Sequence, residues 1–263
     1  MREAAPADLA RVVAAVRDRA PLVHCLTATV SMGLVADGLL AAGARPMMTE
    51  TVAEAPTMTE CADALLVNLG TLSADGAQGI PATVASSTAV GHPWVLDPAA
   101  VGVGPLRTAL AHDVLLRGPS VVRGNASEIR VLAGGGPGGR GADARDCVDP
   151  VSARDLALRS GAVVAVSGPV DLVTDGRREV VVRNGSPMLT RVTGTGCLLG
   201  ALTAACVVAS SPWLGALTAT AWLGIAGEVA ATPGCGPGAF RSALLDALDA
   251  LAPDDVATRV VLG

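Results

Sequence analysis

The stretch Thr190-Arg191-Val192-Thr193-Gly194-Thr195-Gly196-Cys197 leads directly into the apolar segment 198–208. A glycine-rich turn that opens a helix leaves several backbone N–H groups unpaired at the positive end of the helix dipole. Gly194 and Gly196 also let the backbone adopt positive φ and approach a ligand closely, because no Cβ is in the way. The stretch therefore predicts an anion site that suits a phosphate group, formed by the amides of Gly194, Thr195, Gly196 and Cys197.

Cys197 adds a candidate base to this anion site. It lies in the first helical turn, where the helix terminus is expected to lower the pKa of the thiol below its free value of about 8.5. Two other interpretations stay open. The turn could simply cap a buried helix, with Cys197 as a small hydrophobic side chain. Alternatively, the spacing Gly194-x-Gly196-x-x-x-Gly200 could belong to a dinucleotide-binding motif, although residues 216–220 supply no acid where such a motif needs one for ribose.

Composition limits the classes of protein. The chain has 263 residues, 51% of them hydrophobic, which is enough for one large domain with a substantial core, and we predict a single domain over residues 1–263. The net charge of −5, the absence of Tyr and the single Phe argue against nucleic acid as a partner, because the basic residues form no stripe and most stacking side chains are missing.

No segment is typical of a membrane protein or of an exported one. The longest apolar run, residues 197–209, stops at Ser210-Ser211-Pro212, well short of the roughly 20 residues that a membrane span needs. Residues 1–20 carry acids and arginines throughout, unlike a signal peptide. We therefore expect a cytoplasmic protein that does not bind membranes.

The hydrophobic pattern predicts an α/β fold with a mostly parallel central sheet and helices on both faces. Continuous apolar runs, typical of strands that are covered on both faces, occur at 64–70, 94–98, 121–125 and 163–166, with a shorter strand at 22–26. Helical segments alternate with these runs, which implies parallel strands joined by crossovers. Segments 170–173 and 179–183 predict an antiparallel hairpin. Helices are predicted at 6–19, 31–42, 54–62, 198–209, 214–231 and 239–251, and the glycine-rich segment 134–141 is expected to be a surface loop.

Polar residues follow the predicted strands at their carboxyl ends. These are Asn68, Asp97, Arg123-Gly124-Asn125 and Ser167-Gly168. Ligands of open parallel sheets bind beyond these ends, so we expect these residues to converge.

Asn125-Ala126-Ser127-Glu128 forms an N-x-x-E element that opens a helix after a strand. Together with the late glycine-rich turn it resembles the ribokinase superfamily, and within it the hydroxyethylthiazole kinase family. Cysteine at position 197, where the superfamily usually has aspartate, is itself a mark of that family. The matching segments run nearly from end to end: 21–24, 38–44, 67–72, 95–98, 123–129 and 189–199.

The resemblance implies a ribokinase-like kinase that uses ATP as co-substrate and Mg²⁺ as cofactor. Arg123 matches the family's ATP-binding arginine, and its guanidinium suits bidentate contact with phosphate. Ser167 matches a family Thr or Ser that contacts ATP. Asp97 and Glu128 match acids that hold magnesium, partly through water.

The resemblance also implies the acceptor and the assembly. Met48 and Gly194 match positions of the thiazole site, and Cys197 matches the residue that receives or orients the proton of the acceptor hydroxyl. The implied reaction is phosphorylation of the primary hydroxyl of 4-methyl-5-(2-hydroxyethyl)thiazole in thiamine biosynthesis and salvage. A homotrimer with active sites at the subunit boundaries is implied as well.

The departures from the family pattern concentrate on the acceptor side. Cys25 and Ala28 stand where the family has Asn, and Ala cannot replace an amide in hydrogen bonding. Asp37 and Ala100 stand where Asn and Gly are expected. Two alternatives therefore remain, a related kinase that acts on a different small primary alcohol and a non-catalytic nucleotide-binding relative.

Overall fold

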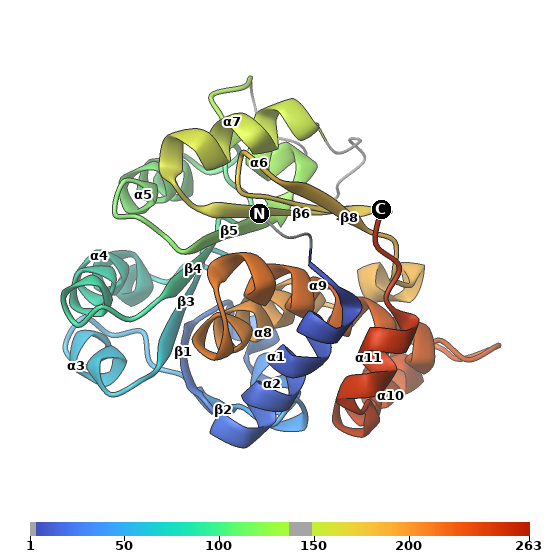
Figure 1. Ribbon diagram of the computed structural model, residues 1–263. Coiled ribbons are helices and arrows are strands. Elements are labelled where there is room, and N and C mark those ends of the chain that lie inside the picture. The colour runs from blue at the N-terminus through green and yellow to red at the C-terminus, as the bar shows by residue number, and fades with distance from the viewer. Residues whose placement is uncertain (1–3, 137–148) are drawn as a thin grey trace.

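The computed structural model describes residues 4–136 and 149–263 (Figure 1). Its strands are β1 (Leu22–Leu26), β2 (Arg45–Met47), β3 (Ala64–Asn68), β4 (Trp94–Asp97), β5 (Val121–Asn125), β6 (Val163–Ser167), β7 (Asp171–Thr174) and β8 (Glu179–Val182). Its α-helices are α1 (Pro6–Arg19), α2 (Met32–Ala41), α3 (Ala55–Glu60), α4 (Ala74–Ala89), α5 (Pro105–Leu115), α6 (Ala126–Leu132), α7 (Pro150–Ser160), α8 (Thr195–Ala209), α9 (Pro212–Ala230), α10 (Pro237–Ala250) and α11 (Pro253–Arg259). Two short 3₁₀ helices, η1 (Thr29–Ser31) and η2 (Pro187–Arg191), complete the described elements.

The strands form one eight-stranded sheet in the order β2-β1-β3-β4-β5-β6-β7-β8. Strands β1 to β6 pair in parallel, whereas β7 and β8 add an antiparallel hairpin at one edge. The predicted parallel sheet and the predicted hairpin are both confirmed.

Helices cover both faces of this sheet, as the apolar strands predicted (Figure 1). Successive residues of β3 point to opposite faces, so Leu66 belongs to one hydrophobic core and its neighbours Leu65 and Val67 belong to the other. The core around Leu66 lies under α1, α2, α8, α9, α10 and α11. The other core lies under α4, α5, α6 and α7, with α3 packed on α4.

The glycine-rich turn opens α8, which packs on β1, β3 and β4. Gly194 is the N-cap with φ of 96°, so α8 begins at Thr195, three residues before the predicted start at Leu198. The 3₁₀ helix η2, and no strand, comes directly before the turn. The dinucleotide-binding interpretation is therefore wrong, because that motif needs a strand that leads straight into the glycine turn.

Among the residues that the structure describes, no helix is long and apolar enough to cross a membrane. The predicted surface loop 134–141 lies outside the described residues from position 137 onward.

Candidate active site

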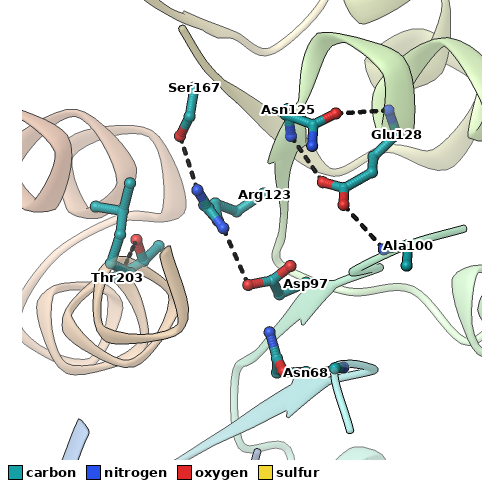
Figure 2. A network of polar contacts seen from close by, with 10 residues as sticks. Asn68, Asp97, Ala100, Arg123, Asn125, Glu128, Ser167 and Thr203 are labelled. Carbon is teal, nitrogen blue, oxygen red and sulfur yellow. Dashed lines mark hydrogen bonds and ion pairs between the residues drawn. The ribbon is translucent and has the colours of Figure 1, made fainter. Parts of the chain in front are cut away.

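The carboxyl ends of the parallel strands bring distant polar side chains together. Asn68 pairs in register with Asp97 across β3 and β4, and Asn125 pairs with Ser167 across β5 and β6. Figure 2 shows these side chains near one another, with Arg123 bonded to Asp97 and Ser167 and with Asn125 bonded to Glu128. The expected convergence is therefore observed, and it follows from the parallel topology.

Arg123 is the centre of the network. Its side chain is only 11% exposed, and its Nη1 forms an ion pair of 3.0 Å with Oδ2 of Asp97. Its Nη2 donates a 2.9 Å hydrogen bond to Oγ of Ser167. The buried Nε has no hydrogen-bond partner in the described structure. Burial alone would lower the pKa of Arg123, but the nearby Asp97, Glu128 and Cys197 raise it above its ordinary value, so the guanidinium remains charged.

Asp97 is a deeply buried carboxylate, with a side chain that is 2% exposed. Burial raises its pKa, whereas the charge of Arg123 and a contact with the amide of Asn68 lower it. We assign the ionised form, because the guanidinium lies at ion-pair distance and would otherwise be a buried charge without a counterion.

Glu128 is held by two backbone amides. Its Oε2 accepts the N–H of Asn125 at 2.8 Å, and the side-chain oxygen of Asn125 accepts the N–H of Glu128 at 3.0 Å, which is a reciprocal capping box at the start of α6. Its Oε1 accepts the N–H of Ala100 at 2.9 Å, from the loop that follows Asp97. Burial and the proximity of Asp97 raise the pKa of Glu128, and the backbone hydrogen bonds oppose this shift.

The start of α8 lies against the same guanidinium. A Cβ at Gly196 would come within 2.9 Å of Nη1 of Arg123, and a Cβ at Gly200 would lie 3.8 Å from Oδ2 of Asp97. The first amides of a helix have no carbonyl partner within the helix, so their N–H groups and the guanidinium create positive potential in one place. This arrangement suits an anionic group such as phosphate.

The environment of Cys197 differs from the expectation. The prediction that the helix start lowers its pKa is wrong, because burial and the charge of Asp97 raise the pKa of the thiol. The hydroxyls of Ser31 and Thr27 and the charge of Arg123 act in the opposite direction without reversing the shift.

Of the residues assigned to the acceptor, Gly194 and Cys197 lie at the start of α8. A Cβ at Gly194 would clash with Cβ of Ser31 at 2.7 Å, so η1 packs directly on the turn. Met48 directly follows β2, is half-buried, and packs on the same hydrophobic core as Cys197. Cys25 and Ala28, at the positions that depart from the family pattern, are buried at the end of β1 and just beyond it.

The other two departures have different surroundings. Asp37 is exposed on α2. Ala100 adopts a φ of 62°, which explains why glycine is expected at this position. Ala100 keeps this unfavourable backbone conformation, and its N–H donates the hydrogen bond to Glu128.

One acid near the site, Asp171, was not predicted from the sequence. Asp171, at the start of β7, accepts the N–H of Gly168 at 2.8 Å and so closes the turn that follows Ser167. Burial raises its pKa to about 6, while the hydrogen bond from Gly168 and the charge of Arg123 lower it. Its only sequence signal was an acid three residues after a glycine, a common turn pattern that predicts no function.

The donor set fits magnesium better than a metal that needs a complete protein cage. Within residues 4–136 and 149–263, no group of three His, Cys, Asp or Glu side chains could hold a metal ion by itself. Asp97 and Glu128 offer two carboxylates close enough to affect each other's charge. Magnesium often binds through one or two carboxylates, with water and substrate phosphates completing its shell.

A ribokinase-like α/β sheet with two acids, an arginine and a glycine turn at a helix start along its carboxyl edge is the arrangement expected of a small-molecule kinase. The family model described as "Hydroxyethylthiazole kinase family" matches residues 13–254. The chain therefore belongs to the hydroxyethylthiazole kinase family, as its motifs predicted.

Individual relatives agree with this assignment. The chain is 50% identical to a hydroxyethylthiazole kinase of Cronobacter sakazakii, over 92% of this chain and 93% of the relative. It is 48% identical to one from Clavibacter sepedonicus, over 92% and 89% of the two chains. The solved hydroxyethylthiazole kinase of Pyrococcus horikoshii superposes with a TM-score of 0.89 and 34% identity, covering 97% of this chain and 98% of that one.

A more distant likeness concerns the fold alone. The pyridoxal kinase of Staphylococcus aureus in complex with ADP has a TM-score of 0.63 at 18% identity, over 79% of this chain and 88% of that one.

Proposed function

We propose that this chain, as a single kinase domain, transfers the γ-phosphoryl group of ATP to the primary hydroxyl of 4-methyl-5-(2-hydroxyethyl)thiazole. The reaction serves thiamine biosynthesis and salvage. Membership of the family supports this activity. The observation that carries the proposed site is the contact of the Arg123 guanidinium with Gly196 while the same group is bonded to Asp97 and Ser167.

The phosphates of ATP would lie between Arg123 and the first turn of α8. The amides of Gly194, Thr195, Gly196 and Cys197 form the anion hole, and Arg123 and Ser167 contact ATP. Phosphoryl transfer needs mainly positioning and stabilisation of charge on the transferring group. A helix start and a guanidinium that are already adjacent provide both without reorganisation.

Asp97 and Glu128 would hold Mg²⁺ together with water and phosphate oxygens. When bound, the ion neutralises charge that develops on the phosphates. The protein keeps both carboxylates in fixed orientations, since Arg123 binds Asp97 and two backbone amides bind Glu128.

Cys197 would receive or orient the proton of the acceptor hydroxyl. The thiol lies in the first turn of α8, so it lies next to the amides that would bind the phosphoryl group. The thiolate form of Cys197 would take this proton as the hydroxyl oxygen attacks the γ-phosphorus and ADP leaves. Because burial and Asp97 raise the pKa of the thiol, this form is a strong base whose population rises with pH. Met48 and Gly194 would line the thiazole site, with the soft Met48 side chain on the ring.

A second candidate function is phosphorylation of a different small primary alcohol. It is favoured by Cys25 and Ala28, which place buried apolar groups where the family has amides. A substrate that accepts hydrogen bonds less well than the thiazole would gain from this change.

An alcohol panel tests both candidates. ADP release and product mass would be measured with the thiazole alcohol, pyridoxal, pyrimidine alcohols and sugars. The first proposal expects the highest kcat/KM with the thiazole alcohol. A higher kcat/KM with another alcohol supports the second candidate function. ATP binding without ADP release with any alcohol would indicate a non-catalytic nucleotide-binding protein.

Two further properties belong to this proposal. We propose a homotrimer with sites at the subunit boundaries, which light scattering of the purified protein tests. We also propose a cytoplasmic location, which fractionation of expressing cells tests.

A further inference from the structure

Asn68 lies beside the metal-binding acid that the proposed function assigns to Asp97. It is the last residue of β3, it is 4% exposed, and it pairs in register with Asp97 on β4. Paired residues of neighbouring parallel strands point to the same face of a sheet, so both side chains face α8.

The orientation of the Asn68 amide is set by its own turn. Its Oδ1 accepts the N–H of Gly70 at 3.0 Å. An amide oxygen must face this donor, so the NH₂ group points the other way, and Figure 2 shows it directed toward Asp97. The turn is tightly packed, because a Cβ at Gly70 would lie 2.7 Å from both Oδ1 of Asn68 and Cβ of Ala28.

The NH₂ group of Asn68 has no competing partner. In the described structure its buried Nδ2 makes no hydrogen bond, and a buried donor without a partner is unfavourable. Asp97 is the acceptor that it faces, and the amide lowers the cost of burying that carboxylate. A small movement of either side chain would complete the hydrogen bond.

Arg123 and Asn68 hold Asp97 differently. Arg123 already shares its guanidinium between Asp97, Ser167 and the α8 turn, and the proposed function gives it phosphate as a further partner. Within the described structure Asn68 accepts from Gly70, and its NH₂ group faces Asp97 (Figure 2). We propose that Asn68 is a positioning residue, which keeps the Asp97 carboxylate in place for magnesium and phosphate while Arg123 engages ATP.

Binding of a non-hydrolysable ATP analogue, measured by calorimetry with Mg²⁺ and again with EDTA, tests this inference, which rests on the proposed function. Asn68→Asp keeps the acceptor for Gly70, replaces the donor by a carboxylate oxygen and adds a negative charge beside Asp97. Asn68→Ser adds no charge and is too short to reach Asp97, yet its hydroxyl can still accept from Gly70. Both variants should weaken Mg²⁺-dependent binding by about 10–100-fold, the range typical of residues that orient metal ligands.

Three comparisons complete the test. Thr218→Val is the matched control, because its buried hydroxyl on α9 also lacks a partner in the described structure, and it should bind as the unmodified protein does. Both Asn68 variants should keep their affinity in EDTA within about threefold, less than 1 kcal/mol. Unchanged Mg²⁺-dependent binding, or an equal loss with and without Mg²⁺, would overturn the inference. Absence of turnover in the unmodified protein would instead count against the proposed function, since the binding comparison does not require turnover.

Discussion

The guanidinium of Arg123 rests on the backbone of Gly196, so closely that a Cβ at Gly196 would come within 2.9 Å of Nη1. The same guanidinium binds Asp97 from β4 and Ser167 from β6. Three elements that are far apart in the chain therefore meet at one cation. Substitutions at this cation or in its surroundings should therefore change binding, turnover or stability.

Gly196→Ala should raise the KM for ATP by about tenfold or more, because displacing a binding group by a fraction of an ångström is costly in a preorganised site. The added methyl would push the guanidinium from the helix start. Steady-state kinetics with varied ATP measures the effect. Gly238→Ala in α10 is the control, since no atom lies within 4 Å of its Cβ position, and it should leave KM unchanged. An unaltered KM in Gly196→Ala would show that the position of Arg123 does not affect ATP binding.

Cys197→Ala should lower kcat by about 10²–10⁴-fold, the usual contribution of a positioned base. Cys197→Asp should stay active, because an aspartate can take the same proton and is ionised at pH 7. Since burial and Asp97 raise the pKa of the thiol, kcat of the unmodified enzyme should rise with pH in the alkaline range. That rise should be absent from Cys197→Asp. Full kcat in the alanine variant would show that Cys197 is no base.

Asp97→Ala should destabilise the protein by about 3–5 kcal/mol, because it leaves the buried charge of Arg123 without its counterion. Chemical denaturation of the two single variants and of the Asp97→Ala, Arg123→Ala double variant gives the coupling energy. The exposed pair of Asp113 and Arg117, at 3.1 Å, serves as the control and should couple by about 0.5 kcal/mol or less. Equal coupling in the two pairs would contradict the burial argument.

Asp171→Asn should stabilise the protein at pH 8. Burial raises the folded-state pKa of Asp171 to about 6, above the unfolded value near 3.8, so the folded protein favours the protonated form. The stabilisation by this proton is complete below about pH 4 and is lost as the pH rises through 6. Each pKa unit corresponds to about 1.4 kcal/mol, so the variant should gain up to about 3 kcal/mol at pH 8.

Measurements at acid pH provide the internal control for the Asp171 prediction. Near pH 4 the difference in free energy of unfolding between Asp171→Asn and the unmodified protein should vanish, because the asparagine mimics the protonated acid and still accepts from Gly168. A difference that does not depend on pH would mean that Asp171 is not the titrating group.

Ala100→Gly should stabilise the protein by roughly 0.5–1 kcal/mol, because the cost of the left-handed conformation for a residue with a Cβ, about 1–2 kcal/mol, exceeds the cost of about 0.4–1 kcal/mol from the greater freedom of glycine in the unfolded chain. Ala100 has a φ of 62° and its N–H binds Glu128. Thermal denaturation measures the change, and turnover should stay the same because the amide is retained. Gly91→Ala is the reverse control, since Gly91 has a φ of 77° and an open surrounding, and it should be destabilised.

Parts of the site could be predicted because their signals are local. Asn125 and Glu128 lie three residues apart and cap the helix that they start, so the N-x-x-E pattern contains the whole interaction. The turn from Gly194 to Cys197 likewise shows its anion site through its glycines and its position before a helix. The exact start of α8 was missed, because the positive φ of Gly194 decides it and the apolar pattern does not.

Other parts could not be predicted, because they depend on how deeply a group is buried. The helix start by itself predicts a lowered pKa for Cys197, but burial and the charge of Asp97 raise this pKa in the folded protein. Asp171 resembles any acid in a turn until its burial beside Arg123 is known. Asn68 is one polar strand end among several until its amide is seen to face Asp97.

The sequence by itself determined the parallel sheet, its helices on both faces and the motifs that lie along its carboxyl edge. Hydrophobic periodicity, helix caps and glycine turns act between residues that are near in the chain, so they can be recognised without a structure. Only the tertiary structure decided which charges meet and which protons are held. Those properties arise from desolvation and from contacts such as Arg123 with Gly196 and Asp97, which join segments that the chain keeps far apart.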